Sequence, residues 1–301
     1  MKVKKDGRRR GRQKYRCSQC GRYFSSGRRA DQSWIHEAYE DYAKHKQTYK
    51  ELSETYGVGP KTLRKLFDKY AGATGEVLED SEPTVLILDA TFFGRGYGIL
   101  MARNPKRVLC WQEIATESLE EYGRCLDQLD AMGCRFSAFA IDGKPGVRQL
   151  LLRRYPGAPV QFCQFHQIQI VKRYIPAKAK TEAARELRAL CLGLAKADGQ
   201  AFGAALDLWH GKHGEFLKEK SLAEDGKAWR YTHRRIRSAH RSLKCNLPYL
   251  FTFQKHPGSR IPNTTNHCDG LFAHIKQKVL IHRGISKKRR KKMIDYLLEN
   301  F

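Results

Sequence analysis

The chain has 301 residues, of which 41% are hydrophobic, and carries a net charge of +26 with an isoelectric point near 9.8. This size allows a sizeable core and roughly two or three domains. No apolar run approaches the length of about 20 residues that a transmembrane helix needs. The basic N-terminus also lacks the apolar stretch of an export signal.

The charge favours a polyanionic partner, with nucleic acid first and an anionic membrane second. Residues 1–30 hold twelve Lys or Arg against one acid, residues 229–246 hold six against none, and 286–292 form a third basic cluster. Residues 81–142 instead hold nine acids and six bases. The basic surface is therefore predicted to surround a segment that is not itself basic. A generally basic, solvated surface is the alternative.

Residues 1–30 are interpreted as a basic arm that carries half a zinc ribbon. Cys17 and Cys20 are spaced as CxxC and precede Gly21, as in one knuckle of a ribbon that binds Zn²⁺. Tetrahedral zinc needs four ligands, and residues 1–16 contain neither Cys nor His. The other half is expected upstream of Met1, or lost. Nine cysteines, mostly isolated, favour reduced thiols over a disulfide framework.

Residues 31–72 are predicted to form a helix-turn-helix domain. Thr48 and Glu51 make a capping box, Gly57 ends that helix, and Pro60 suits the first position of the next. The second helix would present four basic residues to DNA, namely Lys61, Arg64, Lys65 and Lys69. A plain helical hairpin with a solvated basic face is the alternative. Residues 71–83 are interpreted as a linker.

From residue 84 the pattern changes to that of an α/β domain. Apolar, β-rich runs predict strands at 84–93, 94–104 and 107–115, joined as an antiparallel meander. A helix is expected at 118–133, a fourth strand at 135–142, another helix after 145 and a short fifth strand at 158–163. The order βββαβαβ is that of the ribonuclease H fold.

Residues of about 167–255 are predicted to be an all-helical insertion within this domain, which spans 84–301. The insertion is rich in Ala and Leu, and its basic part includes Arg234 and Arg235, which are predicted DNA contacts. Helical spacing returns after residue 265. There Asn266 is expected to cap a helix whose first turn holds Asp269.

Asp89 and Asp142 each stand at the end of an apolar strand. A buried carboxylate is costly unless it is paired or binds a cation. The first and fourth strands of a ribonuclease H arrangement are neighbours, so the two acids would meet at a site for Mg²⁺ or Mn²⁺. Two such ions can promote an in-line phosphoryl displacement. Turn chemistry is the alternative for either Asp taken alone.

Cys163 and His166 stand three residues apart at the end of the fifth strand. They could form half of a metal site, although no second pair is evident. A structural role, or contact with DNA or with the edge of the acid site, is the other interpretation.

Taken in order, these motifs resemble bacterial insertion-sequence transposases and are similar to the Mutator-like group of DDE transposases. The resemblance rests on the segments GRQKYRCSQCGRYF, LDATFF, FAIDG, FCQFH and TTNHCDG, with the helix-turn-helix and the helical insertion between them. It covers nearly the whole chain.

The resemblance implies a metal-dependent enzyme that cuts DNA with water and joins the freed 3′-hydroxyl to a target. Its catalytic acids would be Asp89, Asp142 and Asp269, which would hold two Mg²⁺ ions. The family commonly has Glu at the third position, so Asp269 is a departure. The resemblance further implies terminal inverted repeats as partners, a dimer or larger assembly, and a prokaryotic, cytoplasmic, nucleoid-associated protein.

Two rival functions remain open from the sequence. One is a regulator derived from a transposase that binds DNA without chemistry, which the departure at Asp269 and the half ribbon favour. The other is a ribonuclease H-like nuclease without preference for particular ends, which the predicted helix-turn-helix disfavours.

Overall fold

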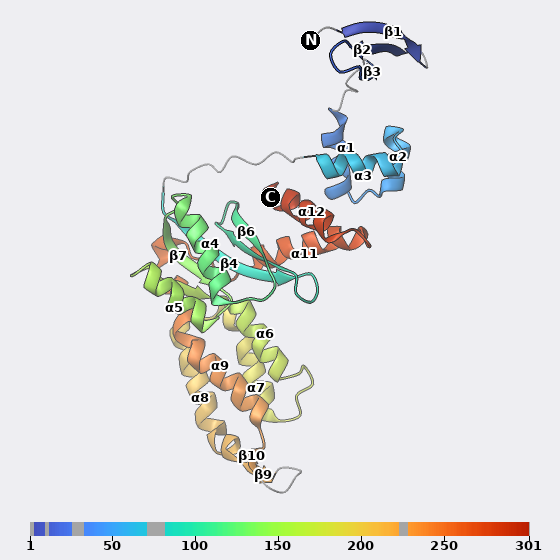
Figure 1. The fold of residues 1–301 in the computed structure, drawn as a ribbon. Coiled ribbons are helices and arrows are strands. Elements are labelled where there is room, and N and C mark those ends of the chain that lie inside the picture. The colour runs from blue at the N-terminus through green and yellow to red at the C-terminus, as the bar shows by residue number, and fades with distance from the viewer. Residues whose placement is uncertain (1–2, 10–11, 26–32, 71–81, 223–227, 301) are drawn as a thin grey trace. The chain divides into compact units, whose positions relative to one another are not determined.

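The computed structural model describes residues 3–9, 12–25, 33–70, 82–222 and 228–300 (Figure 1). Two compact units divide the chain: Met1–Gly75 with Gln277–Asn300, and Glu76–Lys276 with Phe301. The predicted domain of 84–301 therefore extends over residues 277–300 of the first unit. Most of the predicted linker, 71–81, lies outside the described residues. Within the described ranges, no helix combines the length and apolar character that a membrane crossing requires.

The first unit begins with a three-stranded antiparallel sheet in the order β1-β2-β3. Its strands are β1 (Val3–Arg9), β2 (Arg12–Cys17) and β3 (Tyr23–Ser25). Tyr15 and Phe24 stack across the β2 and β3 pair with ring centroids 5.8 Å apart. Cys17 and Cys20 flank the turn that leads from β2 towards β3.

Four helices follow in this unit, namely α1 (Trp34–Ala43), α2 (Tyr49–Tyr56), α3 (Pro60–Lys69) and α12 (Lys287–Glu299). The ends of α2 and α3 are those that the sequence predicts. The predicted capping box is confirmed, because the Thr48 amide donates to Glu51 Oε2 at 2.6 Å and the Glu51 amide donates to the Thr48 hydroxyl. Gly57 ends α2 with φ of 63°, and Pro60 opens α3.

Helix α12 belongs to the first unit because its apolar face is buried against α1 and α3. Tyr296 packs edge-on against Tyr39 at 5.0 Å, and Met293 is fully buried. The Arg289 guanidinium donates two hydrogen bonds of 2.7 Å to the Asp68 carboxylate of α3. This bidentate pair joins α12 to α3 in addition to the buried apolar face.

The second unit is built on a mixed five-stranded sheet in the order β6-β5-β4-β7-β8. The strands are β4 (Thr84–Phe92), β5 (Gly98–Arg103), β6 (Val108–Ile114), β7 (Phe136–Ile141) and β8 (Val160–Phe162), with helices α4 (Leu119–Ala131) and α5 (Pro145–Arg154). β4, β5 and β6 pair antiparallel, whereas β4, β7 and β8 pair parallel. The predicted order is confirmed and fits a ribonuclease H-like α/β fold.

Between β8 and residue 260 the chain forms the predicted helical insertion, which Figure 1 shows as the bundle beneath the sheet. Its elements are α6 (Gln164–Tyr174), α7 (Glu182–Leu192), η1 (Leu194–Lys196), α8 (Gly199–Lys218), β9 (Lys220–Leu222), β10 (Trp229–Tyr231), α9 (Arg234–Leu250), α10 (Thr252–Lys255) and η2 (Pro257–Ser259). The chain then enters α11 (Asn266–Ile281).

The prediction of an all-helical insertion is wrong at the β9 and β10 pair, an antiparallel ribbon at the end of the bundle far from the sheet (Figure 1). Each strand has only three residues, all exposed. Such short, solvated strands carry no hydrophobic alternation that would reveal them in the sequence.

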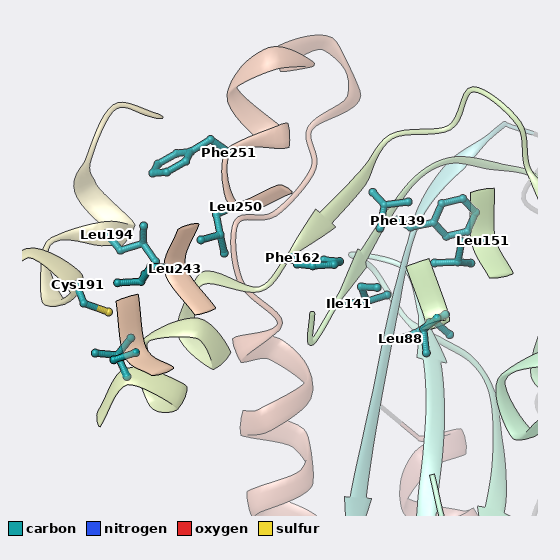
Figure 2. Packing of buried hydrophobic residues seen from close by; sticks show 14 of the residues in the cluster. Leu88, Phe139, Ile141, Leu151, Phe162, Cys191, Leu194, Leu243, Leu250 and Phe251 are labelled. Atoms are coloured by element: carbon teal, nitrogen blue, oxygen red, sulfur yellow. The ribbon is translucent and has the colours of Figure 1, made fainter. Parts of the chain in front are cut away.

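One hydrophobic core joins the sheet to the insertion. Figure 2 shows Phe139 and Ile141 of β7 on one side, Leu243 and Phe251 of the insertion on the other, and Phe162 of β8 between them. Because β8 leads directly into α6, this shared core fixes the start of α6 at the edge of the sheet. The candidate site lies at that junction.

Candidate metal centre

Asp89 lies on the central strand β4 and is only 5% exposed. Its Oδ1 atom accepts a hydrogen bond from the Ala90 amide at 2.9 Å, and its Oδ2 atom is buried without a hydrogen-bond partner. Burial raises the pKa of this carboxyl to about 7, and the Asp269 charge adds to that rise while His166 opposes it. A group held in this way is a candidate for a function other than folding.

His166 and Asp269 complete a cluster with Asp89. One ligand atom from each residue lies within 4.8 Å of the ligand atoms of the other two. Like Asp89 Oδ2, the Asp269 Oδ2 atom is buried and has no hydrogen-bond partner. Two buried carboxylate oxygens without donors, beside an imidazole, form a donor set that fits a divalent metal ion. Among the described residues, this is the one group of three or more such side chains that could hold an ion.

The helix that carries His166 is tied to the segment before α11. The Gln164 amide donates to the Asn263 carbonyl at 2.9 Å, and the Asn263 side-chain amide donates to Gln164 Oε1 at 3.0 Å. These bonds bring residues about one hundred positions apart in the chain to the same place. They hold the first turn of α11, and with it Asp269, against the start of α6.

Thr265 extends this link into the cluster. Its amide and hydroxyl donate to Cys163 Sγ at 3.2 and 3.3 Å, and its hydroxyl oxygen lies 3.3 Å from His166 Nδ1. Thr265 is fully buried, and Cys163 nearly so. The interaction of the His166 ring with the Cys163 side chain raises the pKa of His166 to about 9; the charges of Asp89 and Asp269 add to this rise, and burial opposes it.

The expectation that Asn266 caps α11 is wrong, because the helix starts at Asn266 itself. Thr265 precedes it, and the Cys268 and Asp269 amides donate to the Thr265 carbonyl. The Thr265 side chain contacts Cys163 and His166 instead of the amides of its own helix.

Asp142 lies beside this cluster but is not one of its three members. It follows the last residue of β7, and its Oδ1 atom accepts a hydrogen bond from the Lys144 amide at 3.3 Å. Burial raises the pKa of Asp142, and the nearby Glu117 carboxylate raises it further. The charge of Asp142 in turn contributes to the raised pKa of Asp89, so the two acids lie within electrostatic reach of each other.

Glu117 is a fourth acid next to Asp142 that the sequence predictions do not include. Its carboxylate accepts a hydrogen bond from the Tyr122 hydroxyl at 2.5 Å and pairs with Lys144 Nζ at 2.9 Å. Glu117 lies after β6, outside any motif, so no signal in the sequence singles it out. The segment Thr264–Asn266 is part of a motif in the sequence, but the contacts of Thr265 with Cys163 and His166 are not predicted from it.

The predicted DNA-binding residues are all exposed. Lys61, Arg64, Lys65 and Lys69 lie on α3, and Arg234 and Arg235 lie at the start of α9. Arg64 stacks over the Tyr49 ring at 5.0 Å, and Arg235 donates to the Arg173 carbonyl. DNA contact by these residues, and the helix-turn-helix itself, stay predictions.

Cys17 and Cys20 occupy a knuckle-like turn. The Gly21 amide donates to the Cys17 carbonyl at 3.0 Å, and Gly21 has φ of 68°. Amides at Cys20 and Gln19 lower the pKa of the Cys17 thiol, which favours the thiolate that metals bind. In the part of the chain that the structure describes, no further Cys, His or acid joins them in a cluster. The zinc site therefore stays a prediction.

No known protein family and no curated protein matches the sequence. Among solved structures, the chain is similar to the Drosophila P element transposase strand transfer complex, with a TM-score of 0.31 and 14% sequence identity. The similarity covers 88% of this chain and 78% of that one. A likeness of this degree supports no inference about activity, so the fold and the Asp89, His166 and Asp269 cluster carry the functional argument.

Proposed function

We propose that this protein is a DNA transposase that binds the ends of an insertion sequence and catalyses metal-dependent DNA cleavage and strand transfer. The observation that carries the proposal is the pair of buried, unpartnered carboxylate oxygens of Asp89 and Asp269. Asp89 lies on β4 of a sheet whose strand order fits a ribonuclease H-like fold, and Asp269 lies in the first turn of α11. The motif resemblance to Mutator-like DDE transposases supports the same activity.

In this proposal Asp89 and Asp269 bind Mg²⁺ or Mn²⁺, and Asp142 is the third acid. Divalent ions at such a site activate an attacking oxygen and stabilise the leaving oxygen of a phosphoryl displacement. The protein contributes the positions of the carboxylates. Lys144 orients Asp142 through its amide, and its Nζ atom bonds both the carbonyl and the carboxylate of Glu117.

The proposed substrate is double-stranded DNA with terminal inverted repeats, together with target DNA. A net charge of +26 is a strong attraction for a polyanion. The exposed basic residues of α3 and α9 would contact the phosphate backbone. Assembly of two or more copies on paired ends, a helix-turn-helix in residues 31–72 and a zinc site at Cys17 and Cys20 are parts of the same proposal.

A strand-transfer assay on DNA that carries the inverted repeats flanking the reading frame tests this function. We expect joined products with Mg²⁺ or Mn²⁺ and none with EDTA. Asp269→Ala should abolish them, whereas Asp269→Glu, which restores the side chain common in the family, should retain them. Equal activity of the parent and Asp269→Ala would show that Asp269 is not a catalytic residue.

A DNA-binding regulator without chemistry is the second candidate. Its support is that Asp142 lies outside the compact cluster, so the three acids do not form one close set. A regulator would bind the inverted repeats with the same affinity in EDTA and in Mg²⁺, and would never nick them. Nicking that depends on a divalent ion excludes it.

A further inference from the structure

We propose that His166 is itself a metal ligand, held in place by Thr265 and Cys163, and that the site therefore prefers a divalent transition-metal ion such as Mn²⁺ over Mg²⁺. This inference rests on the proposed function, because the ion would serve that same catalytic site. The binding of the ion itself depends only on the side chains of Asp89, His166 and Asp269, so it can be measured without DNA.

The first step is the composition of the cluster. Of the acids that the sequence singles out, Asp89 and Asp269 share a common site with an imidazole, whereas Asp142 does not join them. The ligand atoms of the three residues lie within 4.8 Å of one another, which is close enough for a single ion to contact all three. The donor set is therefore two carboxylates and one imidazole.

The second step is the way in which the ring is held. The Thr265 hydroxyl donates to Cys163 Sγ, and its oxygen lies 3.3 Å from His166 Nδ1, where it can accept a hydrogen bond from the tautomer that carries the proton on Nδ1. A histidine that donates from Nδ1 keeps the lone pair on Nε2 for a metal. Metal-binding histidines commonly have such a partner, which fixes both the tautomer and the orientation of the ring.

The third step is the support behind Thr265. Its side chain cannot turn to solvent, because the residue is fully buried and its amide also bonds Cys163 Sγ. Cys163 is fixed in turn, since its amide donates to the Ile141 carbonyl of β7 at 2.7 Å. A chain of contacts thus runs from the sheet through sulfur and hydroxyl to the imidazole.

The fourth step is ion preference. Mg²⁺ is bound mainly through oxygen ligands and keeps several waters, so an imidazole nitrogen adds little to its affinity. Transition-metal ions accept imidazole nitrogen readily, and Mn²⁺ also accepts carboxylate oxygen. A mixed set of two carboxylates and one imidazole suits Mn²⁺ better than Mg²⁺.

The alternative role for His166 is that of a cationic partner for the two acids. The raised pKa of His166 favours this imidazolium in the metal-free protein, where it would neutralise the carboxylates. A metal ion that binds the ring has to displace its proton, whereas a pure counter-ion would never bind a metal. The two roles differ in one measurable respect. A ligand places a nitrogen nucleus in direct contact with the bound metal, whereas a counter-ion does not.

The test uses Mn²⁺ alone as the probe on the full chain, without DNA. Electron spin echo modulation of bound Mn²⁺ should show coupling to an imidazole ¹⁴N in the parent and lose it in His166→Gln. Titration followed by Mn²⁺ resonance should show at least about tenfold weaker binding in His166→Gln, with Mg²⁺ affinity nearly unchanged. The matched control is His267→Gln, an exposed histidine of α11 outside the cluster, which should behave like the parent.

Thr265 provides a second readout. Loss of a partner behind a ligand typically costs about 10–100-fold in metal affinity, so Thr265→Val should weaken Mn²⁺ binding by that factor and Thr265→Ser should restore it. Bound Mn²⁺ without ¹⁴N coupling in the parent would overturn the inference, and so would equal Mn²⁺ affinity in the parent and His166→Gln. Because no DNA is present, these results are independent of the strand-transfer assay that tests the proposed function.

Discussion

Asp89 is an acidic residue that is as deeply buried as the residues of the hydrophobic core. Its carboxylate is buried on the central strand of a five-stranded sheet, and only its Oδ1 atom accepts a hydrogen bond. With a pKa near 7, the group is partly protonated at neutral pH in the metal-free protein. The folded state therefore carries a local cost at this position that a cation would relieve.

Asp89→Asn should stabilise the metal-free protein. The pKa is raised from its usual value near 3.8 to about 7, so the ionised carboxylate costs stability that increases as pH rises through that window and then stays constant. At pH 8 in EDTA, we expect Asp89→Asn to unfold with a free energy higher by roughly 3 kcal/mol. At pH 4 the difference should nearly vanish.

Chemical denaturation of both proteins at the two pH values measures this difference. Asp127→Asn, at a carboxylate that is 67% exposed, is the control and should show no such gain. A less stable Asp89→Asn protein at pH 8 would mean that the contacts of the carboxylate in the metal-free protein outweigh the cost of burying its charge.

At this scale the sequence goes as far as residue type and, for Asp142, the end of a strand. The prediction that Asp89 ends its strand is wrong, because β4 continues to Phe92. Asp89 and Asp269 are singled out because an acid after an apolar run, and an acid after TTN, are local signals, and their role as ligands stays a prediction. The role of His166 stays open, because its partners Thr265 and Cys163 come together only when β8 and α11 are placed. Asp142 is a correct strand-end residue, but its Lys144 contact and the neighbouring Glu117 could not be foreseen.

At the scale of elements, the signals that worked are short-range. The capping box of α2 needs only residues 48–51, and the strand order follows from runs of β-forming residues. The β4 and β7 pairing follows from the predicted fold, but contacts between distant helices could not be predicted. The attachment of α12 to α3 depends on Arg289 meeting Asp68, which are more than 200 residues apart. An amphipathic helix reveals that it has a buried face, but not which helix covers it.

The capping box gives a direct prediction. Thr48→Ala removes the hydroxyl that accepts from the Glu51 amide and that donates to Glu51 Oε2. We expect a loss of about 1 kcal/mol in the stability of the first unit. Thermal unfolding measures it, with Thr62→Ala on the exposed face of α3 as the control. Equal loss in both variants would show that the cap contributes nothing specific.

The contact between α8 and α9 should make the insertion sensitive to acid. The His240 ring stacks on His210 at 4.6 Å and packs on Trp209, and its Nε2 atom is buried without a partner. Burial lowers the pKa of His240 to about 4, and the charges of His210 and Lys244 lower it further. Arg237 acts in the same direction, whereas Asp207 opposes it.

Because the folded state disfavours a charged His240, its contribution to stability is present above pH 6.5 and is lost as pH falls towards 4. His240→Phe keeps the stacked ring and removes the titration. The drop in melting temperature between pH 7 and pH 4.5 should therefore be smaller by roughly 2 °C than in the parent. His256→Gln, at an exposed histidine, should leave that drop unchanged. If the melting temperature of His240→Phe fell between pH 7 and pH 4.5 by as much as that of the parent, groups other than His240 would cause the acid sensitivity.

At the scale of the whole molecule, the feature most relevant to binding is the net positive charge. An excess of 26 positive charges makes electrostatic attraction to DNA the first expectation, and such binding weakens steeply with salt. Two units share this charge, since basic residues lie on α3 and α12 of the first and on α9 of the second. The fold class follows from the sequence alone, whereas the allocation of residues 277–300 to the first unit does not.

Removing charge from α3 should lower both affinity and salt dependence. For Lys61→Ala with Lys65→Ala, we expect weaker binding to inverted-repeat DNA. The slope of log affinity against log salt should fall by about 1–2. Fluorescence anisotropy between low and moderate salt measures both quantities, and Lys255→Ala on α10 is the control. An unchanged slope would exclude α3 from the DNA interface.

The most direct test of the central claim is single-turnover cleavage of inverted-repeat DNA by the parent, Asp89→Ala and Asp142→Ala, each in Mg²⁺, Mn²⁺ and EDTA. We predict cleavage by the parent with either ion, none in EDTA, and a loss of at least about 100-fold in both variants, since even the residues behind a metal ligand can change activity by about that factor. Asp127→Ala should cleave like the parent. Cleavage by Asp89→Ala and Asp142→Ala at the parent's rate would contradict the claim that these carboxylates form a metal-dependent active site.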